Sequence, residues 1–371
     1  MHTMHLALPV GEFDFEENPL GRDEFEARVS KLQSVMAAQG WGGVLVFGEI
    51  HESGLLTYYS NYAPRLSPAM VLIPREGAPR VLTLVGDRMV PAGALTTWIE
   101  DVRPAGNLAE SLGEWLAEIE GQGSLATADL DLMQAGHFEN ISDLPQIIEA
   151  VDATEMVRAL VRRKSKAELA LMTENCSILA AVERAVHEAA ATGQSPASCS
   201  VIAEKTARNL GAQDARCLYS PDGGVNFYPF EALSDEVSEP FVLYVALKQR
   251  GYWVDGFVTV GEDDAHGSAL ATLDEILAAT QVGVSYADLD SIRSRRLNGL
   301  ESHPVLNGIL AAGIGVSPTE MPVLKAESSD ALEAGDVVSV KVALFDGKGG
   351  GFASAVVKVS DDSCDILWKS S

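Results

Sequence analysis

The chain has 371 residues, of which 47% are hydrophobic and 22% are charged. This length and composition predict a globular protein of two ordinary-sized domains with ample core, and they exclude a disordered chain. The formal net charge of −26 argues against nucleic acid and anionic membranes as partners, because both require basic patches. Such an acidic surface keeps a protein soluble, and attraction of a cationic substrate is the alternative interpretation.

No stretch of the sequence carries the ~20 consecutive apolar residues that a membrane-spanning helix requires. The first residues turn acidic without a basic region before them, so we expect no secretory signal. The four cysteines form no Cys-x-x-Cys pair, which indicates free thiols in a reducing compartment. They are Cys176, Cys199, Cys217 and Cys364. We therefore expect a cytoplasmic protein.

The first part of the chain alternates between helix and strand patterns. Apolar residues at helical spacing predict helices over 22–40 and 108–119. Short apolar runs between them predict buried strands, over 43–47, 56–59, 69–73 and 80–85. This alternation is typical of an α/β domain with a mixed or parallel sheet.

The second part begins with a long amphipathic helix. Ser165 and Glu168 have the spacing of a capping box, which predicts where this helix starts. The helices that we expect here are, in order, 166–191, 196–210, 268–279 and 286–296. The remaining segments indicate β-hairpins. We therefore expect an α+β protein with domains at 1–155 and 156–371.

Four segments of the second part share an order and spacing with a known set of motifs, and they lie at 242–261, 310–322, 332–341 and 351–360. This set resembles the signature segments of the creatinase/prolidase family, which includes aminopeptidase P, prolidase, methionine aminopeptidase and creatinase. The resemblance implies a C-terminal pita-bread (creatinase/aminopeptidase) domain and a smaller N-terminal creatinase-like α/β domain. It also implies a homodimer.

In the metallopeptidases of that family, the four segments supply five ligands to a pair of metal ions. The resemblance places the ligand positions at Tyr244, Asp255, Ala312, Lys341 and Ser354, or at Ala355 in place of Ser354 if the last segment shifts by one residue. Only Asp255 keeps the expected carboxylate. Divalent cations need several carboxylate or imidazole ligands, and the ammonium of Lys341 repels them. We therefore expect no metal and no other cofactor.

The charge of Lys341 offers a replacement for the missing metal. We predict that its ammonium forms a buried or half-buried ion pair with Asp255; the alternative is an ordinary strand lysine with its head in solvent. A Ser354 hydroxyl beside Lys341 is a possible nucleophile–base pair for amide chemistry. The expected catalytic residues are Asp255, Lys341, Tyr244 and Ser354.

The resemblance also implies residues that bind the substrate. Arg65 follows Tyr62 in a Pro-rich turn, and in creatinase-like dimers an aromatic residue and an Arg from this region reach the partner's site and hold a carboxylate. The alternative for Arg65 is a surface position in the turn. Glu320 matches the Glu of the family's His-Glu-x-Pro motif, and Tyr252 belongs to the Gly-Tyr-x-x-Asp motif. The expected substrate-binding residues are Arg65, Tyr252, Glu320 and Tyr62.

Two histidine positions bear on the chemistry. The family's His that precedes the first Asp position has no counterpart in residues 219–233, which argues against creatine hydrolysis. His303 is the one histidine near a signature segment, and it fits no ligand position, so we expect a loop or core role for it.

The replacements at the ligand positions are chemically capable residues. They favour a metal-independent creatinase- or Xaa-Pro-peptidase-like enzyme that acts on a C–N or similar bond of a small polar substrate. The alternative is a non-catalytic pita-bread pseudoenzyme that binds a small molecule or a protein. A conventional metallo-aminopeptidase is the third possibility.

Overall fold

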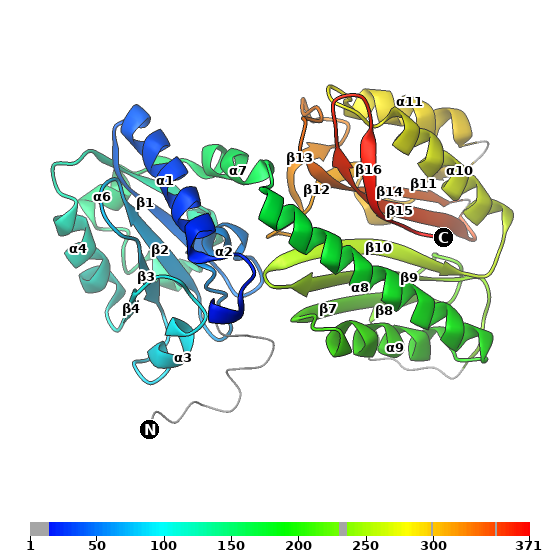
Figure 1. Cartoon of the computed structure of the whole chain (residues 1–371), viewed down its shortest axis with the longest axis horizontal. Helices are drawn as coiled ribbons and strands as arrows, with labels where there is room; N and C mark the ends of the chain where they lie inside the picture. Colours follow the sequence, from blue (N-terminus) through cyan, green and yellow to red (C-terminus); the bar gives the residue numbers. More distant parts are fainter. Residues whose placement is uncertain (1–14, 230–235, 298–299, 346) are drawn as a thin grey trace. The chain divides into compact units, whose positions relative to one another are not determined.

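The computed structural model describes residues 15–229, 236–297, 300–345 and 347–371. The chain divides into two compact units, Met1–Val161 and Arg162–Ser371 (Figure 1). The expected domain boundary after residue 155 lies inside helix α7 (Thr154–Arg162), which runs up to this division. None of the helices in the described ranges is long and apolar enough to cross a membrane.

The first unit is built on a mixed six-stranded sheet in the order β4-β3-β2-β1-β5-β6. The strands are β1 (Trp41–Gly48), β2 (Ala69–Pro74), β3 (Arg80–Thr83), β4 (Asp101–Pro104), β5 (Ser124–Ala128) and β6 (Val151–Asp152). Strand β1 pairs antiparallel with β2 and parallel with β5, so it lies at the centre. Every residue of β1 is buried because helices cover both faces of the sheet.

The helices of this unit pack on opposite faces of β1 (Figure 1). Gly43 faces Trp115 of helix α4, whereas Gly48 faces Leu56 of helix α2. The helices are α1 (Arg22–Gln39), α2 (Gly54–Ser60), α3 (Val90–Ala94), α4 (Leu108–Glu118), α5 (Ala135–Phe138) and α6 (Pro145–Ile148), with 3-10 turns at Phe15–Glu17 and Leu130–Leu132. The predicted helices 22–40 and 108–119 are confirmed as α1 and α4.

The strand predicted over residues 56–59 is wrong, because this segment is helix α2. All seven residues of α2 are buried, so the sequence shows a continuous apolar run without the period of a helix or a strand. A short run of this kind does not distinguish the two structures. The helix ends at Asn61, which adopts the left-handed conformation with φ of 58°. The other three predicted strands are present as β1, β2 and β3.

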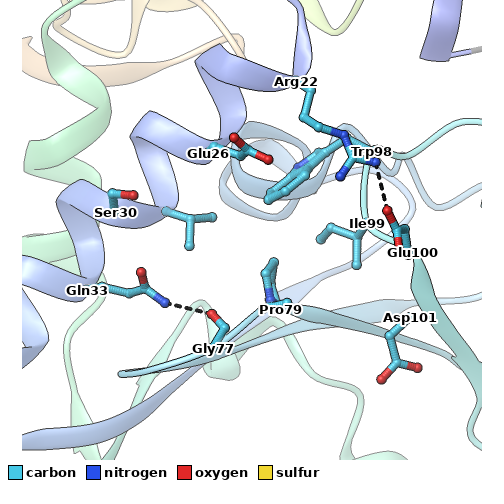
Figure 2. A pocket seen from close by; sticks show the side chains of 12 residues that line it. Arg22, Glu26, Ser30, Gln33, Gly77, Pro79, Trp98, Ile99, Glu100 and Asp101 are labelled. Carbon is cyan, nitrogen blue, oxygen red and sulfur yellow. Dashed lines mark hydrogen bonds and ion pairs between the residues drawn. The ribbon is translucent and has the colours of Figure 1, made fainter.

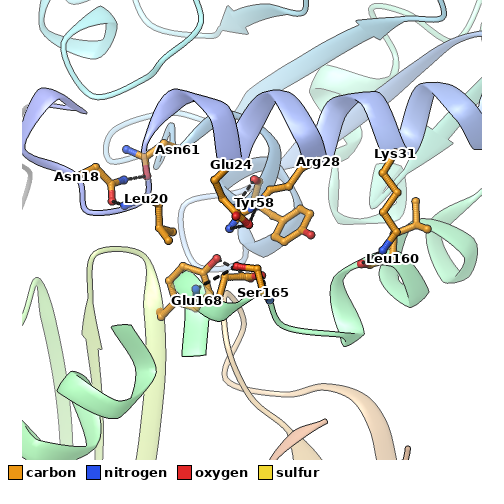
Figure 3. A network of polar contacts seen from close by, with 11 residues as sticks. Asn18, Leu20, Glu24, Arg28, Lys31, Tyr58, Asn61, Leu160, Ser165 and Glu168 are labelled. Carbon is orange, nitrogen blue, oxygen red and sulfur yellow. Dashed lines mark hydrogen bonds and ion pairs between the residues drawn. The ribbon is translucent and has the colours of Figure 1, made fainter. Parts of the chain in front are cut away.

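The side chain of Arg28 ties α1 to α2 within the first unit (Figure 3). It is buried and bonds to Glu24 at 3.1 Å and to the backbone carbonyl of Tyr58 at 2.9 Å. Its guanidinium carbon also lies 4.2 Å from the centroid of the Tyr58 ring and 4.7 Å from that of Phe25. Arg28 and Tyr58 therefore have a packing role in this unit.

The second unit contains two sheets. The first has the order β10-β9-β7-β8 and contains β7 (Asp214–Ser220), β8 (Tyr228–Pro229), β9 (Phe241–Gln249) and β10 (Tyr252–Val260). The second has the order β13-β12-β14-β15-β16, with β11 paired to β14. Its strands are β11 (Glu301–Ser302), β12 (Ala311–Gly313), β13 (Glu320–Leu324), β14 (Val337–Phe345), β15 (Gly350–Val359) and β16 (Cys364–Lys369).

Helices cover one face of each sheet (Figure 1). Helices α8 (Lys166–Ala191) and α9 (Pro196–Asn209) pack on the first sheet. Helix α10 (Asp264–Ala279) packs on β14 and β15, with α11 (Tyr286–Arg296) beside it and a 3-10 turn at Pro304–Leu306. The apolar residues of β14 and β15 that face α10 form a hydrophobic core with this helix and α11.

The start of helix α8 is the capping box that the sequence predicted (Figure 3). Ser165 Oγ accepts from the Glu168 backbone N–H at 3.1 Å, and Glu168 Oε2 accepts from the Ser165 backbone N–H at 2.8 Å. The predicted helices of this unit are confirmed as α8, α9, α10 and α11. Helix α10 begins earlier than the expected residue 268, because Asp263 caps it by accepting from the backbone of His266.

Side-chain hydroxyls join the two sheets of the second unit. Ser354 Oγ of β15 accepts from the backbone N–H of Phe257 in β10 at 2.7 Å. Thr259 Oγ1 of β10 donates to the backbone carbonyl of Phe352 in β15 at 3.1 Å. These bonds hold β10 beside β15, although the two strands belong to different sheets.

Candidate functional site

Asp255 is the centre of a hydrogen-bond network in the second unit. Its side chain is 1% exposed, and Oδ2 lies 2.5 Å from Lys341 Nζ. The same oxygen accepts from the Tyr244 hydroxyl at 2.6 Å, and Oδ1 accepts from Ser339 Oγ at 2.6 Å. The predicted ion pair between Lys341 and Asp255 is therefore confirmed.

Strand geometry brings these residues together. In the β9–β10 hairpin Tyr244 lies opposite Phe257 and Asp255 lies opposite Ala246, so Tyr244 and Asp255 are diagonal neighbours on one face. Ser339 and Lys341 are two residues apart on β14, so both point to the same face of their strand. Ser339 is not among the residues expected at the site, and its spacing of two from Lys341 is the signal in the sequence that points to it.

The three donors compensate the burial of the Asp255 carboxylate. A buried charge is costly unless it is paired and hydrogen-bonded, and Asp255 has both kinds of partner. Burial raises the pKa of Tyr244 well above its usual range, the charge of Asp255 adds to the rise, and the positive charge of Arg216 opposes it. Tyr244 therefore keeps its proton at neutral pH and acts as a donor.

Lys341 is the accessible member of the network. Its side chain is 21% exposed, so the ion pair is half-buried. Its Nζ also lies 5.6 Å from the centroid of the Tyr244 ring, within the range of a cation–π contact. An ammonium has three N–H donors, and Asp255 takes one of them among the described residues.

The strand register also brings Ala312 and Ser354, which stand at two further ligand positions assigned by the resemblance, beside Ser339 and Lys341. Ala312 of β12 lies opposite Ser339, and Ser354 of β15 lies opposite Lys341. Ala355 belongs instead to the core that faces α10, so Ser354 is the residue on the side of Lys341. Within the described ranges, no group of three or more His, Cys, Asp or Glu could hold a metal ion. One carboxylate and one ammonium do not fit a pair of divalent cations.

Ser354 has a position that does not suit a nucleophile. It is fully buried, and its Oγ accepts from the backbone of Phe257. Its backbone N–H and carbonyl bond to Ser370. A nucleophile must reach a substrate atom, so the enclosed hydroxyl supports a role in joining the two sheets and not the catalytic role that the sequence suggested.

Aromatic side chains fill the space beside Tyr244. The ring centroid of Phe257 lies 5.6 Å from that of Tyr244 and 5.2 Å from that of Phe352. Phe227 packs on Phe352 at 5.6 Å. Phe352 in turn lies against Gly224, which has φ of +93° and where a Cβ would come within 2.0 Å of the ring. Gly224 is therefore required for this packing.

His303 belongs to the same aromatic cluster. It is buried, with its ring centroid 5.3 Å from that of Phe352, and its Nδ1 accepts from the backbone of Val305 at 3.0 Å. Burial lowers its pKa, and a hydrogen bond with the Gly224 backbone opposes this shift. His303 is a core residue, as the sequence predicted.

The two substrate-binding residues predicted in the second unit have partners elsewhere. Tyr252 is buried and donates from its hydroxyl to Glu168 of α8 at 2.8 Å. It therefore points to the helix-covered face of β10, opposite to that of Asp255, because strand residues alternate. Glu320 forms a buried ion pair with Lys164 and accepts from the Ser317 backbone at 2.9 Å. The hydroxyl of Tyr252 thus faces away from Asp255, and a substrate role of Glu320 would require its pair with Lys164 to open.

Tyr62 and Arg65 lie in the first unit. Tyr62 is buried, its hydroxyl shares a hydrogen bond with Thr83 at 3.1 Å, and its ring packs against Gly93. Arg65 lies in the loop between α2 and β2 and is partly exposed. Their contribution to the site of a partner subunit stays a prediction.

The first unit also has a pocket of about 570 Å³ between α1 and the edge of the sheet (Figure 2). Its apolar lining includes Trp98 and Ile99, and an exposed ion pair between Arg22 and Glu100 lies at one end at 3.2 Å. Exposed pairs of this kind stabilise a protein little. The pocket contains none of the predicted site residues.

Solved structures resemble this chain over almost its whole length. The X-Pro aminopeptidase from Thermotoga maritima has 18% identity and a TM-score of 0.75, with 92% of this chain and 97% of that chain covered. The prolidase from Thermococcus sibiricus has 18% identity and a TM-score of 0.76, with 95% of this chain and 98% of that chain covered. The Xaa-Pro dipeptidase from Bacillus anthracis has 17% identity and a TM-score of 0.72, with 92% of this chain and 97% of that chain covered.

These similarities define the fold. The chain has the pita-bread fold of the prolidases and X-Pro aminopeptidases, with a second, smaller α/β unit, as its signature segments predicted. No protein-family model matches the sequence, and no curated protein matches it.

Proposed function

We propose that this chain is a pita-bread protein that binds a small polar molecule at the Asp255–Lys341 network and does not carry out dinuclear metal hydrolysis. One observation carries the proposal: the Lys341 ammonium lies 2.5 Å from the one carboxylate that remains at the ligand positions. A chain-borne cation there opposes the binding of metal cations.

The state of the neighbouring groups supports binding more than catalysis. Tyr244 keeps its proton, and Ser354 is fully buried. Asp255 accepts from three donors and is 1% exposed, so it is poorly placed to act as a general base. Lys341 keeps N–H groups that can donate to an oxygen atom of a ligand. These observations reverse the order of the two leading functions expected from the sequence.

The names of the structural neighbours suggest the kind of molecule. The matched proteins are an X-Pro aminopeptidase, a prolidase and an Xaa-Pro dipeptidase. We therefore propose dipeptide-like molecules with a free carboxylate as the first class of ligand. We also propose that the protein is a homodimer in the cytoplasm. Its four free cysteines, three of them buried, agree with a reducing compartment.

Binding and hydrolysis of Gly-Pro and Ala-Pro, measured side by side, test this function. We expect calorimetric binding with no release of proline, whether Mn²⁺ or a chelator is present. Lys341→Met should abolish binding, whereas Lys205→Met, on an exposed face of α9, should leave it unchanged. Proline release that requires Mn²⁺ would overturn the proposal.

A metal-independent enzyme acting on a C–N bond is the second candidate. The partly exposed ammonium of Lys341 favours it, because this group can donate a proton to a leaving group. Hydrolysis that persists in chelator and disappears in Lys341→Met, but not in Lys205→Met, would establish this candidate in place of the first.

A further inference from the structure

Further cationic side chains share the face of the sheet that carries Asp255. Across β7, β9 and β10, Arg216 lies opposite Ala246, which lies opposite Asp255. In the adjacent row Lys248 lies opposite Trp253. Directly opposed residues, and residues two apart on one strand, point to the same side of a sheet. Arg216, Lys248 and Trp253 therefore flank Asp255 on the face that α8 and α9 leave uncovered.

Aromatic rings hold these cations in place. The guanidinium carbon of Arg216 lies 4.6 Å from the centroid of the Trp253 ring, and Lys248 Nζ lies 5.7 Å from it. Trp253 itself is buried beneath them. Together with Lys341 over Tyr244, this gives three cations fixed against two rings.

The charge of this face is opposite in sign to that of the whole chain. The chain has a net charge of −26, yet Arg216, Lys248 and Lys341 gather around Asp255. The other carboxylate nearby, Asp214, accepts from Nε of Arg216 at 3.2 Å and also lies 3.7 Å from Arg208. Among the described residues, Arg216, Lys248 and Lys341 thus accompany two carboxylates, Asp214 and Asp255, and this favours an anion.

Arg216 has the geometry of an anion receptor. Its side chain is 49% exposed, and Nε is the nitrogen that bonds to Asp214. Among the described contacts, Nε is the nitrogen of Arg216 that forms a hydrogen bond. A guanidinium stacked on a ring presents its terminal nitrogens as a planar fork, which matches a carboxylate or a phosphate.

We propose that Arg216, Lys248 and Lys341 form a binding site for an anionic group, carboxylate or phosphate, on a small molecule that lies along the rings of Trp253 and Tyr244. This inference rests on the proposed function, because it names the ligand chemistry of the same face. Strands ~4.8 Å apart put the Cα atoms of Arg216 and Asp255 about 10 Å from each other. One small molecule can therefore touch both Arg216 and Lys341.

The probes are succinate, inorganic phosphate, Gly-Pro and the C-terminal amide of Gly-Pro, measured by calorimetry on the full chain. We expect at least one of the three anionic probes to bind, and amidation of Gly-Pro to weaken binding at least tenfold. Arg216→Gln and Lys248→Met should each lower the affinity for the anion about tenfold, which is the size expected for the loss of one charge-assisted contact. Which anion binds more tightly tells a carboxylate site from a phosphate site.

Matched controls lie on the helices behind the same sheet. Arg184→Gln on α8 and Lys205→Met on α9 remove the same charges from exposed positions, and we expect unchanged affinity. Equal binding of Gly-Pro and its amide would overturn the anion site while leaving the proposed binding function intact. Equal losses in the control variants would also overturn it, and so would the failure of all three anionic probes to bind. Thermal unfolding of each variant verifies that it is folded.

Discussion

Lys341 of β14 and Asp255 of β10 form an ion pair that links the two sheets of the second unit, with 2.5 Å between Nζ and Oδ2. Removing one partner leaves the other charge uncompensated. Because Asp255 is 1% exposed, Lys341→Met should cost more than the ~1 kcal/mol of an exposed pair and approach the ~3–5 kcal/mol of a buried one. Urea denaturation measures the free energy of unfolding.

The double variant Lys341→Met with Asp255→Asn is the control for this prediction. It removes both charges, so we expect it to be more stable than Lys341→Met alone. Free energies of unfolding that simply add across the two substitutions would contradict a direct interaction.

Tyr244 should make stability fall at alkaline pH. Its pKa in the folded protein lies above its usual value of 10.0, so the folded state holds this proton more tightly than the unfolded state. The stabilisation is present below pH 10 and is lost as the pH rises through the folded-state pKa. Tyr244→Phe should remove this component, so its melting temperature should fall less steeply than that of the wild type between pH 9.5 and 11. Parallel curves for the two proteins would count against the argument.

Gly224 tests the packing of the aromatic cluster. Gly223 and Gly224 both have positive φ, so alanine is strained at either position. A Cβ at Gly224 would meet the Phe352 ring at 2.0 Å, whereas at Gly223 the nearest atom is 3.9 Å away. We expect about 1 kcal/mol of destabilisation for Gly223→Ala and about 1–3 kcal/mol more for Gly224→Ala. Equal losses in denaturation experiments would show that Phe352 moves aside without cost.

The purified protein should contain no stoichiometric metal. A single carboxylate paired with an ammonium lacks the ligands that Mn, Co, Zn or Fe require. Elemental analysis of protein prepared without chelator measures this directly. One or more of these metals per chain, lost in Asp255→Ala, would refute the prediction.

We expect a homodimer in solution. The prediction rests on the resemblance around Tyr62 and Arg65, which in creatinase-like dimers come close to the partner's site. Light scattering at micromolar concentration measures the mass, and a value of 39.4 kDa, that of one chain, would contradict it.

Local signals in the sequence were sufficient for most of the fold. Ser165 and Glu168 predicted the start of α8 because a capping box involves residues only three apart. The apolar run 56–59 was predicted as a strand but forms a helix. Its full burial removes the spacing of apolar residues that distinguishes a helix from a strand. Gly40, with φ of 77°, ends α1 where the sequence placed it.

One ion pair of the candidate site could be predicted from the sequence. Lys341 and Asp255 were paired from their charges and from the ligand positions that the resemblance assigned. The contact of Ser339 with Asp255 and the place of Arg216 beside Ala246 could not be predicted, because they depend on strand register across distant segments. The sequence places Ser354 beside Lys341 but does not reveal that its hydroxyl is enclosed between the sheets.

The boundary between β10 and β15 is held by hydroxyl groups of Ser354 and Thr259. A boundary of this kind, here called the seam, can change one side chain at a time. Each substitution removes one hydrogen bond between the sheets and leaves the backbone hydrogen bonds within each sheet in register. The side chains between the two sheets can therefore be replaced while each sheet keeps its shape. The residues on either side of the seam are therefore where mutations that give this fold a new ligand should be sought first.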